Sequence, residues 1–284
     1  MAKKEFKLMQ KFKTLNLYLY AMIFLMIIVI AFPLYWMVLT SFQPTTQATS
    51  YPPFLFFKSF SLEKIKWIIT NTKIIKWIMN SLLVSLGVVF MNLLVSVPAA
   101  YSIAKFRIKF NNILLLVVLV TQMIPQAIMV VPLFEIFKSI NLINNLFSVI
   151  LANIILTLPL GTWILIGFFE NIPSEIEEAA VIDGASRTML FFKISLPLTY
   201  PAMITVAIIT FFDAWNEYMY GYTFIYNQDK WVGTVGIASF IGQFLTDWQA
   251  IMTSSLLFSF IPMTVYIFFR KYIVRGVSEG FAKG

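Results

Sequence analysis

The 284-residue sequence contains neither cysteine nor histidine. Without these residues, disulfides, thiol chemistry, histidine general bases and Cys/His metal sites are all excluded. The motif G-x-x-x-x-G-K-[ST] is also missing, so the chain carries no Walker-type ATP site of its own. Charge is scarce as well, because Asp, Glu, Lys and Arg together make up only 12% of the residues. The chain is therefore poor in the side chains that most enzymes use.

Apolar residues dominate what is present. Hydrophobic types make up 60% of the sequence and the mean hydropathy is +0.83, whereas an average soluble domain is about 45–50% apolar. The net charge of +8 suggests nucleic-acid binding at first, but the Lys and Arg residues cluster beside apolar runs, which is typical of membrane topology. The composition predicts an all-α membrane protein with several spans.

Six apolar runs are long enough to cross a bilayer, for which about 20 residues suffice. They cover residues 15–42, 77–104, 113–134, 146–169, 201–224 and 250–269. The first run follows a basic N-terminus, residues 1–14, and it exceeds the apolar core of a signal peptide, so we expect an uncleaved span. Residues 43–76 suit an extracytoplasmic segment with a short amphipathic helix, and residues 270–284 form a basic cytoplasmic tail.

The distribution of basic residues predicts the orientation of these spans. If the N-terminus is cytoplasmic, the cytoplasmic segments hold 14 of the 21 Lys and Arg residues and the external segments hold 7. Because cytoplasmic loops carry an excess of basic residues, this arrangement is favoured. An even number of spans then places both termini in the cytoplasm, together with the loop between the fourth and fifth spans.

That loop, residues 174–197, is typical of a soluble helix-turn-helix. Ser174 and Glu177 have the spacing of a capping box, in which each side chain would satisfy a free backbone amide at the helix start. Ala179-Ala180 combine high helix propensity with almost no side chain, so another surface can approach the backbone closely. Gly184 permits a sharp turn before a second short helix that ends at a proline. A folded loop in this position suggests a binding element, which we call the 174–197 loop.

Polar residues interrupt the fifth apolar run at Asp213, Asn216 and Glu217. On one continuous helix, this spacing would bring the three side chains to nearly the same face. Ionisable groups inside a span usually face a bundle interior or water, which favours a solute pathway, whereas structural contact between subunits is the alternative. The neighbouring Trp215 and Tyr218 suit either stacking on sugar rings or an interfacial aromatic belt.

Several motifs resemble those of permease subunits in ABC-type carbohydrate importers. The strongest resemblance is to the EAA loop of that family, and it is carried by Glu178-Ala179-Ala180, Gly184, Ile194 and Leu196-Pro197. Three further stretches are similar to carbohydrate permeases, the last of them to the smaller, maltose-type subunit: Pro98–Tyr101 before Lys105-Phe106, Ala214–Tyr218, and the tail from Arg275 to Gly284.

The resemblance covers nearly the whole chain and implies a six-span subunit of the cell membrane, with residues 77–269 as its permease core. It implies that this subunit pairs with a different permease, two ATPase chains and an extracytoplasmic solute-binding protein. ATP and Mg would be bound by the ATPase chains, so we expect no catalytic residue, cofactor or metal here, and no nucleic-acid partner. The expected solute is a sugar or oligosaccharide.

The resemblance also implies roles for individual residues. ATPase coupling falls on Glu178, Ala179, Ala180, Asp183, Gly184, Ile194, Leu196 and Pro197, and a solute pathway on Asp213, Trp215, Asn216, Glu217 and Tyr218. In the tail, Arg275, Gly280 and Lys283 are candidates for a contact with the ATPases. Two alternatives remain open: a permease for another solute, such as an amino acid, phosphate or peptide, and a stand-alone secondary transporter.

Overall fold

A computed structural model describes residues 2–106, 113, 116, 120–242 and 245–281, with side chains described between residues 18 and 271. Within these residues the regular elements are helices, and the β-contact is an isolated bridge between Ile241 and Thr246. The all-helical class predicted from the sequence is confirmed. The chain divides into two compact units, residues 1–72 with 240–257 and residues 73–239 with 258–284.

The first unit contains three helices and the beginning of a fourth: α1 (Ala2–Phe42), α2 (Thr45–Ala48), α3 (Glu63–Asn71) and α14 (Trp248–Phe281). The buried Gln249 side chain donates to the carbonyl oxygens of Thr40 and Gln43 at 3.2 and 2.8 Å. An ion pair of 2.6 Å joins Lys64 to Asp247. Helix α3 lies within residues 43–76, where the sequence predicts a short amphipathic helix.

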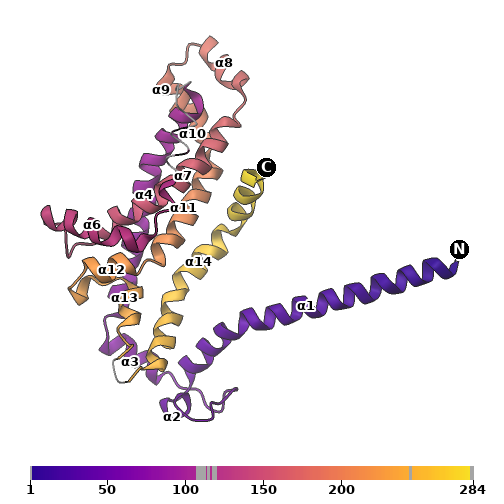
Figure 1. Ribbon diagram of the computed structural model, residues 1–284, viewed down its shortest axis with the longest axis vertical. Coiled ribbons are helices and arrows are strands. Elements are labelled where there is room, and N and C mark those ends of the chain that lie inside the picture. Colours follow the sequence, from indigo (N-terminus) through magenta and orange to yellow (C-terminus); the bar gives the residue numbers. More distant parts are fainter. Residues whose placement is uncertain (1, 107–112, 114–115, 117–119, 243–244, 282–284) are drawn as a thin grey trace. The chain divides into compact units, whose positions relative to one another are not determined.

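Three long helices form the centre of the second unit: α4 (Ile74–Lys105), α7 (Leu146–Glu170) and α11 (Tyr200–Trp215), which pack against one another (Figure 1). Their contact faces are rich in small and polar residues, among them Ser85, Asn92 and Ser96 on α4. Such residues let helix backbones approach closely and form hydrogen bonds in a membrane, where apolar side chains gain little from leaving lipid. In one such bond, Asn92 donates to the Thr157 hydroxyl at 2.9 Å.

Shorter helices complete the second unit: α6 (Gln126–Ser139), α12 (Met219–Phe224), η2 (Gln228–Lys230) and α13 (Gly233–Ala238). The beginning of α4 holds η2, because the Trp77 indole donates to the Gln228 carbonyl at 2.8 Å and two lysines pair with Asp229. Hydrogen bonds from Lys73 and Lys76 hold the pKa of the exposed Asp229 carboxyl below its usual value. These contacts attach the segment after α12 to one end of α4.

Four of the described helical segments are long and apolar enough to cross a membrane: Tyr18–Phe42, Ile74–Lys105, Leu146–Glu170 and Trp248–Lys271. They match the first, second, fourth and sixth predicted spans. A fifth span is obtained when the bent pair Arg187–Leu198 and Tyr200–Trp215, which meet at 68°, counts as one.

The predicted third span, residues 113–134, falls partly outside the described residues, as does most of the basic turn that follows Lys105. Its second half is the beginning of α6, which starts after Pro125 and continues to Ser139. Proline lacks a backbone N–H and restricts the residue before it, so a helix beginning directly after Pro125 follows from the sequence.

Candidate functional site

The first half of the 174–197 loop is α8 (Ser174–Ile182). The predicted capping box is wrong, because Pro173 occupies the position before the first turn and no side chain caps this helix end. Ser174 is therefore the first helical residue, one position later than a capping residue must be. The Glu177 carboxylate instead contacts Lys105 and Ser195.

The second half begins after Gly184, whose backbone has φ +85°. This is the left-handed region, which residues with a Cβ enter at a cost, so the glycine predicted to form the turn does so. Three consecutive helical segments follow: α9 (Arg187–Met189), η1 (Leu190–Ser195) and α10 (Leu196–Leu198). The Ser186 hydroxyl caps α9 by accepting from the Met189 amide at 3.3 Å. The loop is thus two helical arms joined by a tight turn.

The two arms expose an unusual amount of apolar surface. Ile182 is 85% exposed and Phe192 is 59% exposed, and Ile176, Val181 and Met189 are exposed as well. Of the residues in the EAA-like motif, Glu178, Ala179, Asp183 and Gly184 are exposed and Ala180 is half-buried. Helix α8 lies beyond one end of the α4–α7–α11 group, and α9 lies beside that end (Figure 1). Exposed apolar clusters of this kind mark interaction surfaces.

Side-chain contacts connect the loop to the end of α4. The Lys105 ammonium lies 3.2 Å from the Glu177 carboxylate and donates to the Ile172 carbonyl at 3.2 Å. The other oxygen of Glu177 accepts from the Ser195 hydroxyl at 3.2 Å, so this carboxylate of α8 contacts both α4 and η1. The sequence does not single out Lys105 or Ser195 for this contact: a basic residue after an apolar run is explained by topology alone, and a lone serine carries no signal.

The predicted fifth span, residues 201–224, is not one helix. Helix α11 ends at Trp215, and α12 begins at Met219 after a short irregular segment. Asp213 and Glu217 therefore do not share a helix face, contrary to the spacing argument. Glu217 is only 6% exposed, and its two carboxylate oxygens accept the backbone amides of Tyr220 and Gly221. Since these are the first amides of α12, the carboxylate stabilises the start of that helix.

The aromatic residues beside Glu217 lie in different surroundings. Trp215 is buried and stacks on Phe211 and Phe258, with ring centroids 5.6 and 4.5 Å away. Tyr218 is exposed and stacks on Tyr222 at 5.5 Å, and Asn216 is exposed too. Of the two aromatic residues, only Tyr218 is accessible to a partner or solute in this chain.

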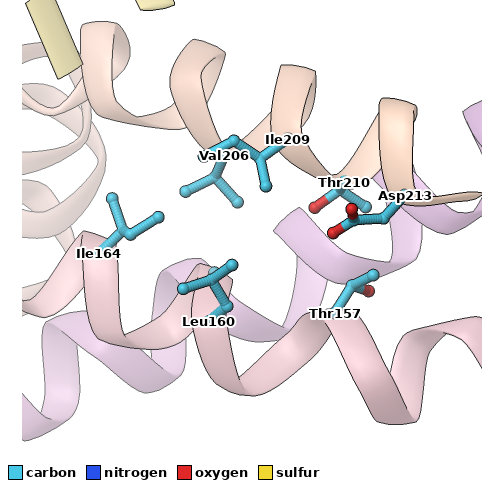
Figure 2. A pocket seen from close by; sticks show the side chains of 8 residues that line it. Thr157, Leu160, Ile164, Val206, Ile209, Thr210 and Asp213 are labelled. Atoms are coloured by element: carbon cyan, nitrogen blue, oxygen red, sulfur yellow. The ribbon is translucent and has the colours of Figure 1, made fainter. Parts of the chain in front are cut away.

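Asp213 lies at a hollow between α7 and α11 (Figure 2). The hollow is narrow: its space between atoms is about 170 Å³, which includes open solvent, and it leaves no room for a water molecule. It is lined by Thr157, Leu160, Gly161, Ile164, Val206, Ile209, Thr210 and Asp213. Figure 2 shows the polar groups Asp213, Thr210 and Thr157 together at one end, with apolar side chains at the other. Because Thr157 also accepts from Asn92, this polar end continues into the buried α4–α7 interface.

Of the tail residues singled out in the sequence, Arg275 and Gly280 belong to the last turns of α14, but their side chains lie outside the described set. Lys283 lies outside the described residues altogether.

Comparison with known protein families gives a match over more than half of the chain. Residues 93–279 match the family described as "binding-protein-dependent transport system inner membrane component". The matched range contains the 174–197 loop, the hollow beside Asp213 and the start of α12.

Individual relatives are similar over most of their length. The sulfoquinovosyl glycerol transport system permease protein SmoH of Agrobacterium fabrum is 32% identical over 254 residues, which is 89% of each chain. The trehalose/maltose transport system permease protein MalG of Thermococcus litoralis is 32% identical over 266 residues, covering 92% of this chain and 94% of the relative.

The fold is similar to that of solved transporter chains. A chain in the crystal structure of a bacterial ABC transporter involved in the import of alginate has a TM-score of 0.80 at 18% identity, covering 92% of this chain and 96% of that one. A chain of the MetNI methionine ABC transporter has a TM-score of 0.61 at 15% identity, covering 75% and 98%.

Proposed function

Because the chain belongs to the family of binding-protein-dependent transport system inner membrane components, we propose that it is a permease subunit of an ATP-driven ABC importer for a sugar or oligosaccharide. One observation carries the choice of solute class: the chain is about 30% identical, over about nine tenths of its length, to permeases named for a glycoside and for trehalose and maltose. Hydrolysis of ATP is assigned to separate chains, since no Walker motif is present here.

The subunit has six spans and pairs with a second, different permease, two ATPase chains and an extracytoplasmic solute-binding protein. Both termini and the 174–197 loop lie in the cytoplasm, in keeping with the excess of basic residues there. The solute arrives on the binding protein at the external side. Closure of the ATPase chains on ATP then drives rigid-body movement of helices, which opens the pathway to one side at a time.

The 174–197 loop is the element that receives this movement. Its exposed residues Glu178, Ala179, Asp183 and Gly184 supply a surface of two small and two acidic residues that fits a cleft on an ATPase chain. The apolar side chains beside them, Ile182 and Phe192 foremost, become buried when that contact forms. Tail residues Arg275, Gly280 and Lys283 add a second contact from the C-terminal side.

Half of the solute pathway is formed by the face that carries Asp213. Its exposed carboxylate, which lies beside the buried Thr157 and Thr210, offers acceptors to the hydroxyl groups of a sugar as it passes the hollow. Tyr218 and Asn216 line the external approach, where both are exposed. Glu217 and Trp215 are assigned to support, because their side chains are buried against α12 and Phe258.

Purification in mild detergent tests this function. We expect an ATPase chain and a second permease to co-purify, identified by their masses. After reconstitution with the associated binding protein, the complex should accumulate a sugar only when ATP is present. Recovery without any ATPase, or uptake that needs no ATP, would overturn the proposal in favour of a secondary transporter. ATP-driven uptake of an amino acid, phosphate or peptide instead would overturn the solute class alone.

A further inference from the structure

The end of α4 is the place where the second span meets the 174–197 loop. Helix α7 leads into the loop and α11 leads out of it along the backbone, so both are joined to it covalently. Helix α4 has no such connection, because the chain continues from it toward α6. Movement of the loop therefore reaches α4 only through noncovalent contacts, which are the packing of α4 on α7 and α11 and the direct contacts between the end of α4 and the loop.

Three polar side chains take part in the direct contact between α4 and the loop: Lys105, Glu177 and Ser195. We call these three residues the Lys105 triad. Lys105 belongs to the last turn of α4, Glu177 to the first arm of the loop and Ser195 to the second arm. The ammonium group lies 3.2 Å from one carboxylate oxygen, and the serine hydroxyl donates to the other at 3.2 Å. The carboxylate thus joins α4 to both arms at once.

The triad is shielded from water, unlike the other acidic groups of the loop. The side chains of Lys105 and Glu177 are 14% and 20% exposed, and Ser195 is fully buried. By contrast, Glu175, Glu178 and Asp183 are exposed. Charges shielded in this way interact more strongly and are less screened by salt than charges on an open surface. Removing one member also leaves its partner charged and poorly solvated.

Aromatic packing reinforces the same connection. The Tyr101 ring, one turn before Lys105, lies 5.5 Å from the Phe169 ring on α7 and 4.8 Å from the Phe191 ring on η1. The Arg187 guanidinium of α9 lies 5.4 Å from the Phe106 ring, directly after α4. Apolar contact holds the arms beside α4, and the ionic triad determines their direction, because hydrogen bonds are directional and packing contacts are not.

We propose that Lys105 is a positioning residue that transmits movement of the 174–197 loop to the second span, through Glu177 and Ser195. The inference rests on the proposed function, since it assigns a role within an ATP-driven importer. When an ATPase chain moves the loop, the triad makes α4 move with α7 and α11 as one group. Without it, packing alone connects the end of α4 to the loop, so α4 follows the movement less completely and more ATP is hydrolysed for each opening of the pathway.

The test uses the complete complex with its binding protein in proteoliposomes. The variants are Lys105→Met, which removes the charge, Glu177→Gln, which keeps the shape but weakens the pair, and Lys105→Arg as the conservative rescue. Lys138→Met on α6 is the matched control, because it removes an exposed lysine from a helix that precedes the beginning of α7, whereas the loop follows the end of α7. Three quantities are measured on each sample: ATPase chains retained per permease, the rate of ATP hydrolysis, and solute transported per ATP.

We expect Lys105→Met and Glu177→Gln to retain the ATPase chains and hydrolysis while solute per ATP falls about fivefold or more, the lower end of typical coupling effects. Lys105→Arg should restore most of the ratio. An unchanged ratio in both variants would overturn the inference, and so would loss of ATPase chains in proportion to uptake, which indicates a docking role. If the Lys105→Met complex does not assemble, the solute transported per ATP by the Glu177→Gln complex decides between the outcomes. Failure of the proposed function can be told apart from failure of this inference, because in that case the wild-type complex itself shows no ATP-dependent uptake.

Discussion

Two acidic residues four positions apart, Asp213 and Glu217, have opposite surroundings. The Glu217 carboxylate is buried and accepts two backbone amides, whereas the Asp213 carboxylate is exposed at the polar end of the hollow. A carboxylate whose oxygens are both occupied by its own chain has little left for a solute. The same change from acid to amide should therefore have different consequences at the two positions.

We predict that Asp213→Asn lowers uptake per assembled complex about tenfold, the value of one hydrogen bond to a charged group. Glu217→Gln should instead lower stability by about 2 kcal/mol, since the amide NH₂ cannot accept a backbone N–H. Uptake and assembled complex are measured on the same membranes. The pathway assignment of Asp213 fails if its variant transports normally per complex, and the support assignment of Glu217 fails if its variant assembles normally but does not transport.

Two glycines provide a second contrast at the residue scale. A Cβ built on Gly236 of α13 would lie 2.1 Å from the Trp77 ring, which a hydrogen bond to the Gln228 carbonyl holds in place. A Cβ on Gly167, inside α7, would meet nothing within 4 Å. The first glycine is therefore required for close approach, and the second only lowers helix propensity.

We expect Gly236→Ala to destabilise the subunit by about 1–3 kcal/mol through overpacking. Gly167→Ala should be neutral or stabilising by up to about 1 kcal/mol, because alanine is the better helix former. Thermal unfolding of the purified complex, followed by the loss of soluble protein, measures both. Equal melting temperatures for the two variants would contradict the close packing of α13 on α4.

The residue types of the candidate site could be predicted from the sequence, but their partners could not. Acidic residues inside an apolar run stand out by composition, so Asp213 and Glu217 were found directly. That Glu217 satisfies the start of α12 depends on a helix break at residues 216–218, which the apolar pattern does not reveal, because Trp215 and Tyr220 continue it without interruption.

At the element scale, the turn of the 174–197 loop depends on one backbone conformation. Gly184 has φ +85°, and a Cβ placed on it would meet nothing within 4 Å. The cost of replacing this glycine therefore comes from the backbone and not from a clash. Among residues with a Cβ, asparagine tolerates the left-handed region best and β-branched residues tolerate it worst.

We predict that Gly184→Val weakens ATPase binding and uptake together, at a cost of about 1–2 kcal/mol in the loop. Gly184→Asn should retain most of both activities, and both variants should still pair with the second permease because the turn lies outside the spans. The measurements are ATPase retained per permease and uptake on the same membranes. Full binding and uptake in Gly184→Val would mean that this turn does not position the loop for coupling.

Long helices with a uniform apolar pattern can be predicted well from the sequence, whereas local capping motifs cannot. The bounds of α4 and α7 differ from the predicted spans by three residues or fewer at each end, because membrane-length apolar runs admit little besides helix. The predicted capping box is wrong at α8, because Pro173 occupies the cap position and Ser174 is already the first helical residue. A capping motif depends on single residues such as Pro173. The Glu177 side chain that the motif would use pairs with Lys105 instead.

At the scale of the whole molecule, the two ends of α4 differ in chemistry. Near its beginning, Lys73 and Lys76 pair with the exposed Asp229, and at its end Lys105 pairs with the shielded Glu177. Exposed pairs contribute little to stability, whereas shielded pairs cost more when broken. The proposed orientation places the exposed pairs outside the cell and the shielded pair beside the ATPase chains, where a firm connection is needed.

The absence of cysteine makes this orientation directly testable, because any single introduced cysteine is the only thiol in the chain. We choose Tyr226→Cys before η2 and Ile182→Cys at the end of α8, since these side chains are 61% and 85% exposed. A membrane-impermeant maleimide applied to intact cells should label Tyr226→Cys alone, and permeabilised cells should show labelling at both positions. The basic-residue bias of 14 cytoplasmic to 7 external is the physical reason, as it sets the direction in which spans insert. Labelling of Ile182→Cys in intact cells would place the 174–197 loop outside, where no ATPase chain can reach it, and the coupling role of that loop would have to be abandoned.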